Sequence, residues 1–283
     1  MKHFRQFVVA NTEDEAISLR KTVGTKSLFI AGGTTVVPMA GESVEVLIDI
    51  SRLGLDGISD RDGWITIGAT TRLSSILSPD IKAAVPMLFE ALRHCATPLV
   101  RNMATLGGSL AGIYLPSDAG VALAALGAKL EMRGDEERVV PVDDLLAGAW
   151  LSGYELIRSV RIPKLGQGQG WGFSKFGRSD VDIALVNVAA VVGITDGSRI
   201  SDLRLAIGQS SSKPVLLTDF GEDRGDKGIS HDLIRKIAES ASEQVKVKAD
   251  FRASSAYRKH LVSVLAARSI LAAAQEAGAR LED

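Results

Sequence analysis

Two glycine-containing loops are the part of this sequence whose residue types and spacing suit ligand chemistry. The first, Ala-Gly-Gly-Thr-Thr at 31–35, directly follows an apolar run at 27–30. Because its glycines carry no Cβ, backbone N–H groups at a sharp turn there can reach an anion, which is how backbone holds a phosphate. The second, Thr-Leu-Gly-Gly-Ser at 105–109, adds hydroxyl groups beside a second bare backbone. Together the loops predict a clamp around one extended dinucleotide.

Each loop alone also has a purely structural interpretation. A double glycine is typical of a tight turn or of a close helix–sheet contact, and for either loop taken singly this interpretation is favoured. Asp118 follows Ser109 by nine residues and supplies a carboxylate that can accept hydrogen bonds from ribose hydroxyls. The combination of both loops with this acid favours dinucleotide binding over two unrelated turns.

Other catalytic signatures are absent from the sequence. It contains no GxGxxG, GxxxxGK[ST], HExxH or GxSxG motif, and its four histidines are scattered. Its single cysteine, Cys95, excludes an internal disulfide and any metal site that needs several thiolates. Redox chemistry in this chain would therefore depend on an organic cofactor, and we expect no metal site.

Composition limits the class of protein and its partners. With 283 residues, of which 46% are hydrophobic, the chain is long and apolar enough for a globular core divided between two domains. Its 33 basic and 34 acidic residues offer no excess positive charge for nucleic acid or anionic lipid. The longest apolar stretches are shorter than the roughly 20 residues that span a bilayer, and the N-terminus lacks a secretory pattern. We expect a cytoplasmic protein without a transmembrane segment.

The elements that must position the loops follow from hydrophobic periodicity and turn residues. In the first 55 residues we expect strands at 7–10, 27–30 and 44–50, with a helix that starts within 11–16. From 56 to 165 we expect a hairpin at 58–68, helices at 70–77 and 79–95, an apolar helix from about Asp118, and strands at 128–132 and 154–162.

A glycine-rich segment at 163–170 predicts the domain boundary. Beyond it we expect strands at 171–176, 183–194 and 203–208, followed by helices at 232–245 and 254–277. The last third of the chain is therefore predicted to be a small α+β unit.

The loops resemble those of the flavin-binding medium subunit of the molybdenum hydroxylases, the family of carbon monoxide dehydrogenase and xanthine dehydrogenase. In that family they read approximately AGG[TH]xLxP and RNxxT[IL]GG[NS], and residues 31–38 and 101–109 match them here. Further segments match in the family's order over nearly the whole chain: IGATT at 67–71, PSD at 116–118, the KxxRxxxDIA-like stretch at 175–184, and DFRAS…YR at 250–258.

The resemblance implies an α+β fold with two units. Residues 1–165 would form a two-lobed FAD-binding domain of the p-cresol methylhydroxylase type, with lobes of about 1–55 and 56–165. Residues 171–283 would form a small C-terminal α+β domain that caps the flavin. FAD would then lie between the two domains.

The resemblance also implies site residues. Backbone amides of one set would hold the FAD pyrophosphate: Ala31, Gly32, Gly33, Thr34 and Thr35. A second set would surround the adenosine half, with Asp118 on the ribose: Ala96, Thr105, Gly108, Ser109 and Asp118. Ile157 would lie beside the isoalloxazine, and a third set would approach the ring from the C-terminal domain: Lys175, Asp182 and Ile183. No side chain is expected to act as acid or base, and a cation such as Lys175 near the ring would stabilise reduced flavin.

The sequence departs from the family pattern in two places. Ser109 stands where many relatives have Asn, which keeps a hydrogen-bonding group but shortens its reach, and the stretch 112–115 is less polar than is common before the PxSD motif. Cys95 alone cannot hold the additional iron–sulfur cluster that some relatives carry in this subunit, so that branch of the family is excluded.

The function implied is electron transfer within a multi-subunit enzyme. A small subunit with two [2Fe-2S] clusters would deliver electrons from a molybdopterin-containing large subunit to FAD, which would pass them to NAD or another acceptor. One alternative is a self-sufficient FAD-dependent oxidase or reductase of the same fold. The other is a non-enzymatic scaffold that has lost FAD, although the glycines of both loops are intact.

Overall fold

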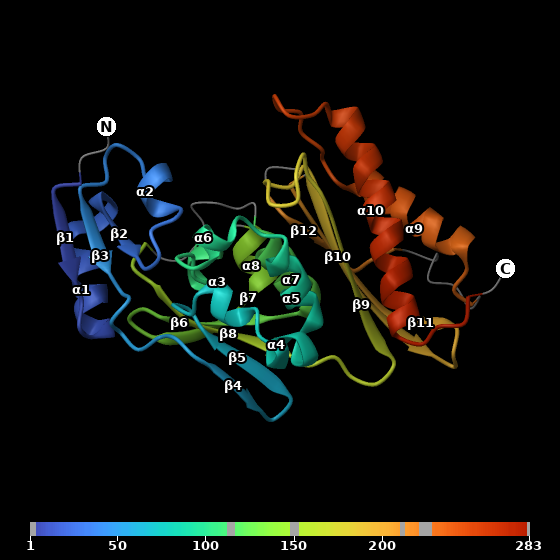
Figure 1. Ribbon diagram of the computed structural model, residues 1–283, viewed down its shortest axis with the longest axis horizontal. Coiled ribbons are helices and arrows are strands. Elements are labelled where there is room, and N and C mark those ends of the chain that lie inside the picture. The colour runs from blue at the N-terminus through green and yellow to red at the C-terminus, as the bar shows by residue number, and fades with distance from the viewer. Residues whose placement is uncertain (1–3, 112–116, 148–152, 210–212, 221–227, 282–283) are drawn as a thin grey trace.

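The computed structural model describes residues 4–111, 117–147, 153–209, 213–220 and 228–281, which form three sheets and their helices (Figure 1). The blue N-terminal lobe holds a parallel three-stranded sheet in the order β1-β3-β2. Its elements are β1 (Gln6–Val9), α1 (Glu13–Val23), the 3-10 turn η1 (Gly24–Lys26), β2 (Ser27–Ile30), α2 (Val36–Met39) and β3 (Val46–Asp49). The predicted strands and helix of this lobe are confirmed.

Helix α1 begins where its capping residues predict. The hydroxyl of Thr12 accepts a hydrogen bond from the backbone N–H of Glu15. Acidic residues occupy the first turn and basic residues the last, which suits the helix dipole. Its buried Ala16 packs against the sheet, so α1 fixes the end of β2 from which the first glycine loop emerges.

The second lobe is built on an antiparallel sheet in the order β4-β5-β8-β6-β7. Its strands are β4 (Ile58–Arg61), β5 (Trp64–Gly68), β6 (Lys129–Arg133), β7 (Glu137–Pro141) and β8 (Leu156–Pro163). Its helical elements are α3 (Leu73–Ile76), α4 (Pro79–Ala84), α5 (Pro86–Arg93), α6 (Pro98–Arg101), the 3-10 turn η2 (Gly107–Ser109), α7 (Asp118–Leu126) and α8 (Val142–Ala147). The charged strand β7 was not predicted.

Two predicted helices of this lobe are shorter than expected. The helix expected over 79–95 is divided into α4 and α5, because Pro86 lacks an N–H and disfavours helical backbone at Val85, which has φ −140° and ψ 66°. The helix expected over 70–77 is a single turn, α3. The apolar helix expected from Asp118 is confirmed as α7, and every one of its residues is buried.

The C-terminal unit is an antiparallel sheet in the order β12-β11-β10-β9. Its elements are β9 (Gln169–Phe176), β10 (Val186–Thr195), β11 (Arg199–Gly208), β12 (Val215–Leu217), α9 (His231–Gln244) and α10 (Ser255–Glu276). Both helices cover one face of this sheet, and α7 of the second lobe packs on the other face (Figure 1). The sheet therefore joins two hydrophobic cores, one on each side.

Close packing explains two of the glycines that the sequence assigned to a linker or to strand β9. A Cβ added at Gly170 would lie 2.1 Å from the carbonyl oxygen of Ala273, and one added at Gly172 would lie 2.1 Å from that of Ser269. Helix α10 thus contacts the backbone of β9 directly. The glycine-rich segment is in part the start of β9 rather than a free linker.

The C-terminal DFRAS…YR segment supports the same unit. Arg258, 2% exposed, donates from Nη1 to the carbonyl oxygens of Leu185 (2.9 Å) and Gln209 (2.5 Å). Its Nη2 lies 2.7 Å from Oδ1 of Asp250. Although burial alone would raise it, hydrogen bonds from Arg252 and Arg258 hold the pKa of Asp250 well below its ordinary value. The motif therefore ties the start of α10 to the ends of β10 and β11.

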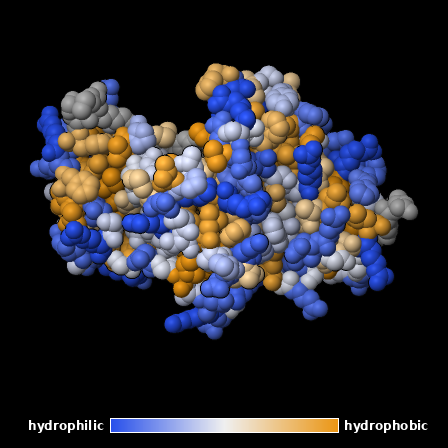
Figure 2. All heavy atoms as spheres, in the orientation of Figure 1, coloured by the Kyte–Doolittle hydropathy of each residue, from blue (hydrophilic) through white to orange (hydrophobic). Residues whose placement is uncertain are grey.

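The surface is mixed rather than uniformly polar. Figure 2 shows hydrophilic side chains over much of the C-terminal unit and apolar side chains reaching the surface of the N-terminal lobe, where Phe7, Val37 and Met39 are about half exposed. Within the described residues, no helix is long and apolar enough to cross a membrane.

Candidate cofactor-binding site

The backbone amides of the first glycine loop are available to a ligand within the described part of the structure. It connects β2 to α2, and Gly33 turns the chain with φ +71°. Among the residues that the structure describes, the N–H groups of Gly32, Gly33, Thr34 and Thr35 have no hydrogen-bond partner. Consecutive free amides at a turn form a concave donor site for an anion.

The second glycine loop is docked on the segment that follows β5. The N–H of Gly107 donates to the carbonyl oxygen of Ala69 (2.8 Å), and that of Leu106 donates to the carbonyl oxygen of Thr71 (3.0 Å). A Cβ added at Gly107 would lie 2.7 Å from the Cβ of Ala69. The IGATT and TLGGS motifs of the sequence are therefore two halves of one packed contact.

The remaining polar groups of the second loop bond to one another. The N–H of Gly108 donates to Oγ1 of Thr105 (3.2 Å). The hydroxyl of Ser109 donates to the carbonyl oxygen of Thr105 (3.1 Å). The two loops also touch, because a Cβ added at Gly32 would lie 1.9 Å from the carbonyl oxygen of Met103. Glycine at 32 thus allows the first loop to lie against the chain that leads into the second.

A cavity of about 740 Å³ opens between the two loops. Eleven of the fourteen residues predicted from the sequence line it, and ten of these precede residue 165: Ala31, Gly32, Gly33, Thr34, Thr35, Ala96, Thr105, Gly108, Ser109 and Ile157. Ile183, predicted to approach from the C-terminal unit, lines it as well. Its size is that of ordinary ligand pockets, and its apolar walls with a few polar groups suit a flat aromatic ligand.

A turn at Cys95 and Ala96 forms another part of the wall. Ala96 has φ +54°, and Arg101 holds the turn by donating from Nη1 to the carbonyl oxygens of Cys95 (2.9 Å) and Ala96 (2.6 Å). Burial, with a further contribution from the charge of Asp118, raises the pKa of the Cys95 thiol to about 11. The arginine of the RNxxT motif is therefore a positioning residue for this wall.

The remaining three predicted residues, Asp118, Lys175 and Asp182, do not line this cavity. Asp182 instead pairs with Arg178, whose Nε lies 2.9 Å from its Oδ2. Asp118 and Lys175 contact each other. The ammonium of Lys175 lies 2.9 Å from Oδ2 of Asp118 and donates to the carbonyl oxygen of His94 (2.6 Å). Oδ1 of Asp118 accepts from the amide of Asn187 (2.6 Å). The two charged side chains are only 8% and 9% exposed. Lys175 and Asn187 belong to the C-terminal unit and Asp118 to the second lobe, so this buried pair joins the two.

Burial is the main influence on the pKa of the Asp118 carboxyl group. Burial raises the pKa of its carboxyl group above the ordinary value, whereas the adjacent Lys175 and the hydrogen bond from Asn187 oppose that shift. Removing one member of a buried ion pair leaves the other charge without compensation. The integrity of this junction therefore depends on both residues.

Sequence reasoning missed several residues of the cavity wall. Arg20 of α1 lines the cavity, donates to Ser27 Oγ (3.2 Å) and has its pKa lowered by burial. Glu155 lines it too and forms a bidentate ion pair with Arg138, at 2.5 and 2.7 Å. Glu155 comes directly before β8 and two residues before Ile157, so the alternation of side chains along the chain could have indicated that both face the same side. No pattern in the sequence distinguishes Arg20 from other basic residues of an exposed helix face.

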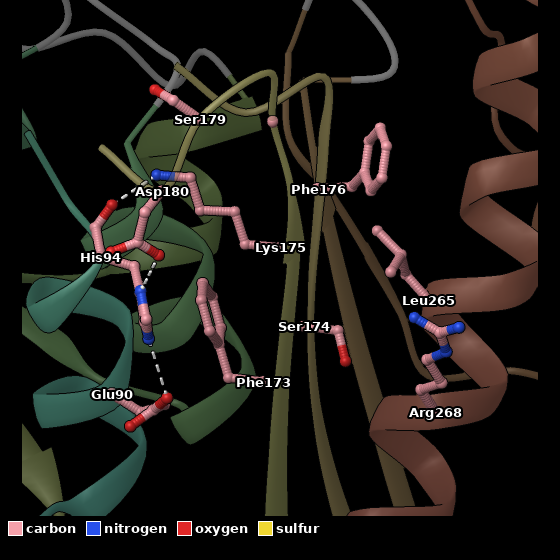
Figure 3. Close-up of a pocket in the computed structure, with 11 residues that line it drawn as sticks. Glu90, His94, Phe173, Ser174, Lys175, Phe176, Ser179, Asp180, Leu265 and Arg268 are labelled. Carbon is pink, nitrogen blue, oxygen red and sulfur yellow. Dashed lines mark hydrogen bonds and ion pairs between the residues drawn. The ribbon is translucent and has the colours of Figure 1, made fainter. Parts of the chain in front are cut away.

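A second cavity of about 540 Å³ lies between α5, β9 and α10 (Figure 3). On its α5 side, His94 approaches two carboxylates, Nδ1 at 2.5 Å from Oδ1 of Asp180 and Nε2 at 3.2 Å from Oε1 of Glu90. This cavity shares no lining residue with the first. Within the described parts of the chain, no group of three or more His, Cys, Asp or Glu residues is placed to hold a metal ion.

Fold and site together define a flavoprotein subunit, and comparison with known proteins agrees. Residues 2–165 match the family described as the FAD binding domain in molybdopterin dehydrogenase. Residues 171–273 match the CO dehydrogenase flavoprotein C-terminal domain. The chain therefore belongs to the FAD-binding medium subunits of the molybdenum hydroxylase family, as its motifs indicated, and it is an oxidoreductase subunit that binds FAD.

Relatives within this family extend over almost the whole chain. The nicotine 6-hydroxylase medium subunit of Paenarthrobacter nicotinovorans is 32% identical, covering 90% of each chain. The glyceraldehyde dehydrogenase medium chain of Sulfolobus acidocaldarius is 33% identical, covering 83% of this chain and 86% of that one. Among solved structures, the carbon monoxide dehydrogenase of Hydrogenophaga pseudoflava is 25% identical with a TM-score of 0.90, covering 98% of this chain and 99% of that chain. The predicted α+β fold is thereby confirmed.

Proposed function

We propose that this chain carries electrons through FAD between partner subunits of a molybdenum-containing dehydrogenase or hydroxylase and an external acceptor such as NAD. The single observation that carries the proposal is the row of free amides at the rim of a cavity of ligand size. FAD, when bound, supplies the redox chemistry, because it accepts and releases electrons that no side chain of this protein can carry.

The residues of the chain bind and orient the cofactor. Backbone amides of the first loop, 31–35, hold the pyrophosphate, since they are free donors on one side of the cavity. Ala96, Thr105, Gly108 and Ser109 surround the adenosine half. The apolar side chains of Ile157 and Ile183 pack on the isoalloxazine, where they exclude water from the ring.

Asp118 and Lys175 support the site from behind the cavity wall. Their mutual ion pair fixes α7 against the C-terminal sheet, and Asn187 adds a hydrogen bond to the same carboxylate. This arrangement gives them a positioning role in place of the direct ribose and ring contacts that the family motif suggests. The boundary between the FAD-binding and C-terminal domains falls between residues 165 and 171.

The partners we propose are a small subunit with [2Fe-2S] clusters and a large subunit with molybdopterin, in the cytoplasm. The names of the relatives support a multi-subunit enzyme, since they are called medium subunit, medium chain or subunit alpha of a complex. The chain itself has one cysteine and so cannot hold such clusters.

The test is to purify the chain from cells that co-express its neighbours and to record the visible spectrum with a subunit count by mass. We expect flavin bands, iron–sulfur absorbance and two further chains. A yellow monomer that oxidises a substrate alone would instead make it a self-sufficient oxidase, and a colourless protein would make it a scaffold without cofactor.

A further inference from the structure

Strand β9 presents an open edge, and its peptide groups show which way that edge faces. The N–H of Ile194 donates to the carbonyl oxygen of Gly168 (2.8 Å), and that of Leu185 donates to the carbonyl oxygen of Phe176 (2.7 Å). Peptide groups alternate in direction along a strand, so the even-numbered residues of β9 face β10 and the odd-numbered ones face outward. The outward groups have no hydrogen-bond partner among the described residues: Trp171, Phe173 and Lys175.

This edge differs from the other sheet edges of the described chain. Strands β1, β2, β4, β7 and β12 are edges of three to five residues, and β7 carries two charges and ends in Pro141. Short length, charge and proline are the usual protections of an edge against pairing with another chain. Strand β9 has eight residues and no proline, and its one charge, Lys175, is turned into the buried pair with Asp118.

The second cavity is a groove along this edge. In Figure 3 β9 forms its floor, with Glu90 of α5 and His94, which follows that helix, on one side, and with Leu265 and Arg268 of α10 on the other. Arg268 is exposed, and its guanidinium has no ion pair or hydrogen bond with any residue in the described ranges. Free peptide groups of the described part of β9 suit an extended peptide. The carboxylates of Glu90 and Asp180 line the side of the groove near His94, so an acidic side chain of that peptide is favoured only opposite Arg268, the cation that has no partner among the described residues.

We propose that an extended segment of a partner subunit pairs with the open edge of β9, with an acidic side chain opposite Arg268. This inference rests on the proposed function, in which the chain is one subunit of a complex. A strand of usual length, about six residues, matches the open part of the edge.

A second copy of this chain fits the edge less well as the occupant. Its own β9 contains no acidic residue, and the one charged side chain of that strand, Lys175, is turned into the buried pair with Asp118. The β9 strand of a second copy would therefore offer no carboxylate to Arg268.

Amide hydrogen exchange with single-residue resolution tests the pairing, on the chain alone and in the co-purified complex. In the chain alone we expect the amides of Phe173 and Lys175 to exchange at least tenfold faster than those of Ser174 and Phe176, which bond to β10. In the complex we expect all four amides to exchange slowly. Amides of Phe173 and Lys175 that stay fast in an assembled, flavin-containing complex would overturn the inference while leaving the proposed function intact.

Two further outcomes are decisive. Protection that appears in the chain alone as its concentration rises would identify a second copy as the occupant and overturn the proposal. Failure of the chain to assemble with any partner would contradict the proposed function and this inference together, and a normal flavin spectrum in that protein would show that the FAD site itself is sound.

A charge reversal tests the role of Arg268. We expect Arg268→Glu to weaken assembly of the complex at least tenfold, as measured by the partner concentration needed for half-maximal binding. Lys259→Glu makes the same charge change at another exposed position of α10 and is the matched control, with a change below twofold. Equal effects of the two variants would overturn the assignment of an acidic residue opposite Arg268.

Discussion

The two glycine loops have similar composition, yet their backbone groups are used in opposite ways. The amides at 32–35 have no partner among the described residues, whereas those at 106–109 all donate to oxygen atoms of the protein. The amides of the first loop are therefore available to bind a ligand, whereas those of the second loop hold the cavity wall in place. A glycine pair in a sequence does not by itself distinguish these two uses, because both need the absence of a Cβ.

The same contrast extends to the charged residues that the sequence places near the second loop. Asp118 follows that loop, but both oxygens of its carboxylate have partners within the protein, Lys175 and Asn187. Free donors thus lie on the first-loop side of the cavity and satisfied groups on the other side. Substitutions on the second side should reduce stability, and substitutions in the first loop should reduce cofactor binding.

Lys175→Met should have the largest effect on stability. It leaves the buried Asp118 carboxylate without its cation, and breaking such a pair costs about 3–5 kcal/mol of unfolding free energy. Chemical denaturation measures this loss. The double variant Asp118→Asn/Lys175→Met should recover most of it, because no uncompensated charge remains.

The Lys175 variant also distinguishes two roles for this residue. A loss below about 1 kcal/mol combined with weaker FAD binding or a changed flavin midpoint potential would show that Lys175 acts on the cofactor directly. That result would contradict the conclusion that the first loop binds the cofactor while residues on the second-loop side only stabilise the protein.

Gly32→Ala should remove most bound FAD. Its Cβ would lie 1.9 Å from the carbonyl oxygen of Met103, so the first loop must move, at a cost of about 1–3 kcal/mol, and its free amides would no longer converge. The ratio of absorbance at 450 nm to that at 280 nm measures the FAD content. Gly41→Ala is the matched control in the same lobe, because its nearest neighbour atom would be 3.7 Å away. Retention of full FAD content in the Gly32 variant would contradict a role of this loop in binding.

Thr105→Val should have a smaller effect, mainly on stability. The substitution keeps the shape of the side chain but removes the oxygen that accepts from the N–H of Gly108, at a cost of about 1 kcal/mol. Thermal unfolding of the FAD-free protein measures it. If FAD affinity falls more than tenfold while the unfolding temperature is unchanged, the hydroxyl of Thr105 serves the cofactor rather than the loop.

The smallest expected effect concerns the thiol of Cys95, which should react only very slowly with alkylating reagents in the folded protein. With its pKa raised to about 11, the thiol is protonated at neutral pH, and the thiolate fraction increases only as the pH approaches that value. Alkylation of the folded protein at pH 8 should be about 100-fold slower than that of the unfolded chain. Rapid modification of the folded protein would show that this wall of the cavity is open to solvent.

The sequence predicted much of the site because its motifs are local. Loop residues that are adjacent in the chain stay adjacent in the cavity, so eleven of the fourteen predicted residues line it. Of the three that do not, Asp118 and Lys175 are 57 positions apart and belong to different domains. Their pairing depends on how the C-terminal sheet packs on α7, which no periodicity reveals. The apolar character of α7 indicated a buried helix but not that it lies between two units.

Elsewhere the errors have local causes. Apolar spacing continued through Val85 and Pro86, so one helix was predicted where proline divides two. The charged residues of β7 obscured the strand pattern in the sequence, so this strand was not predicted. It is an edge strand that pairs only with β6. Gly170 was assigned to the predicted domain boundary and Gly172 had no role beyond its predicted strand, whereas α10 packs against both.

Backbone amide chemical shifts of the FAD-free protein, measured by NMR during titration with FAD and separately with riboflavin, test the central claim most directly. FAD should shift the amides of Gly32, Gly33, Thr34 and Thr35 strongly downfield, since they gain a charged acceptor, while riboflavin, which has no phosphate, should leave them nearly unchanged. The amides of Leu106 and Gly107 should move little with either ligand, because they already donate within the protein. Equal shifts at both loops with FAD, or none at the first, would contradict the account.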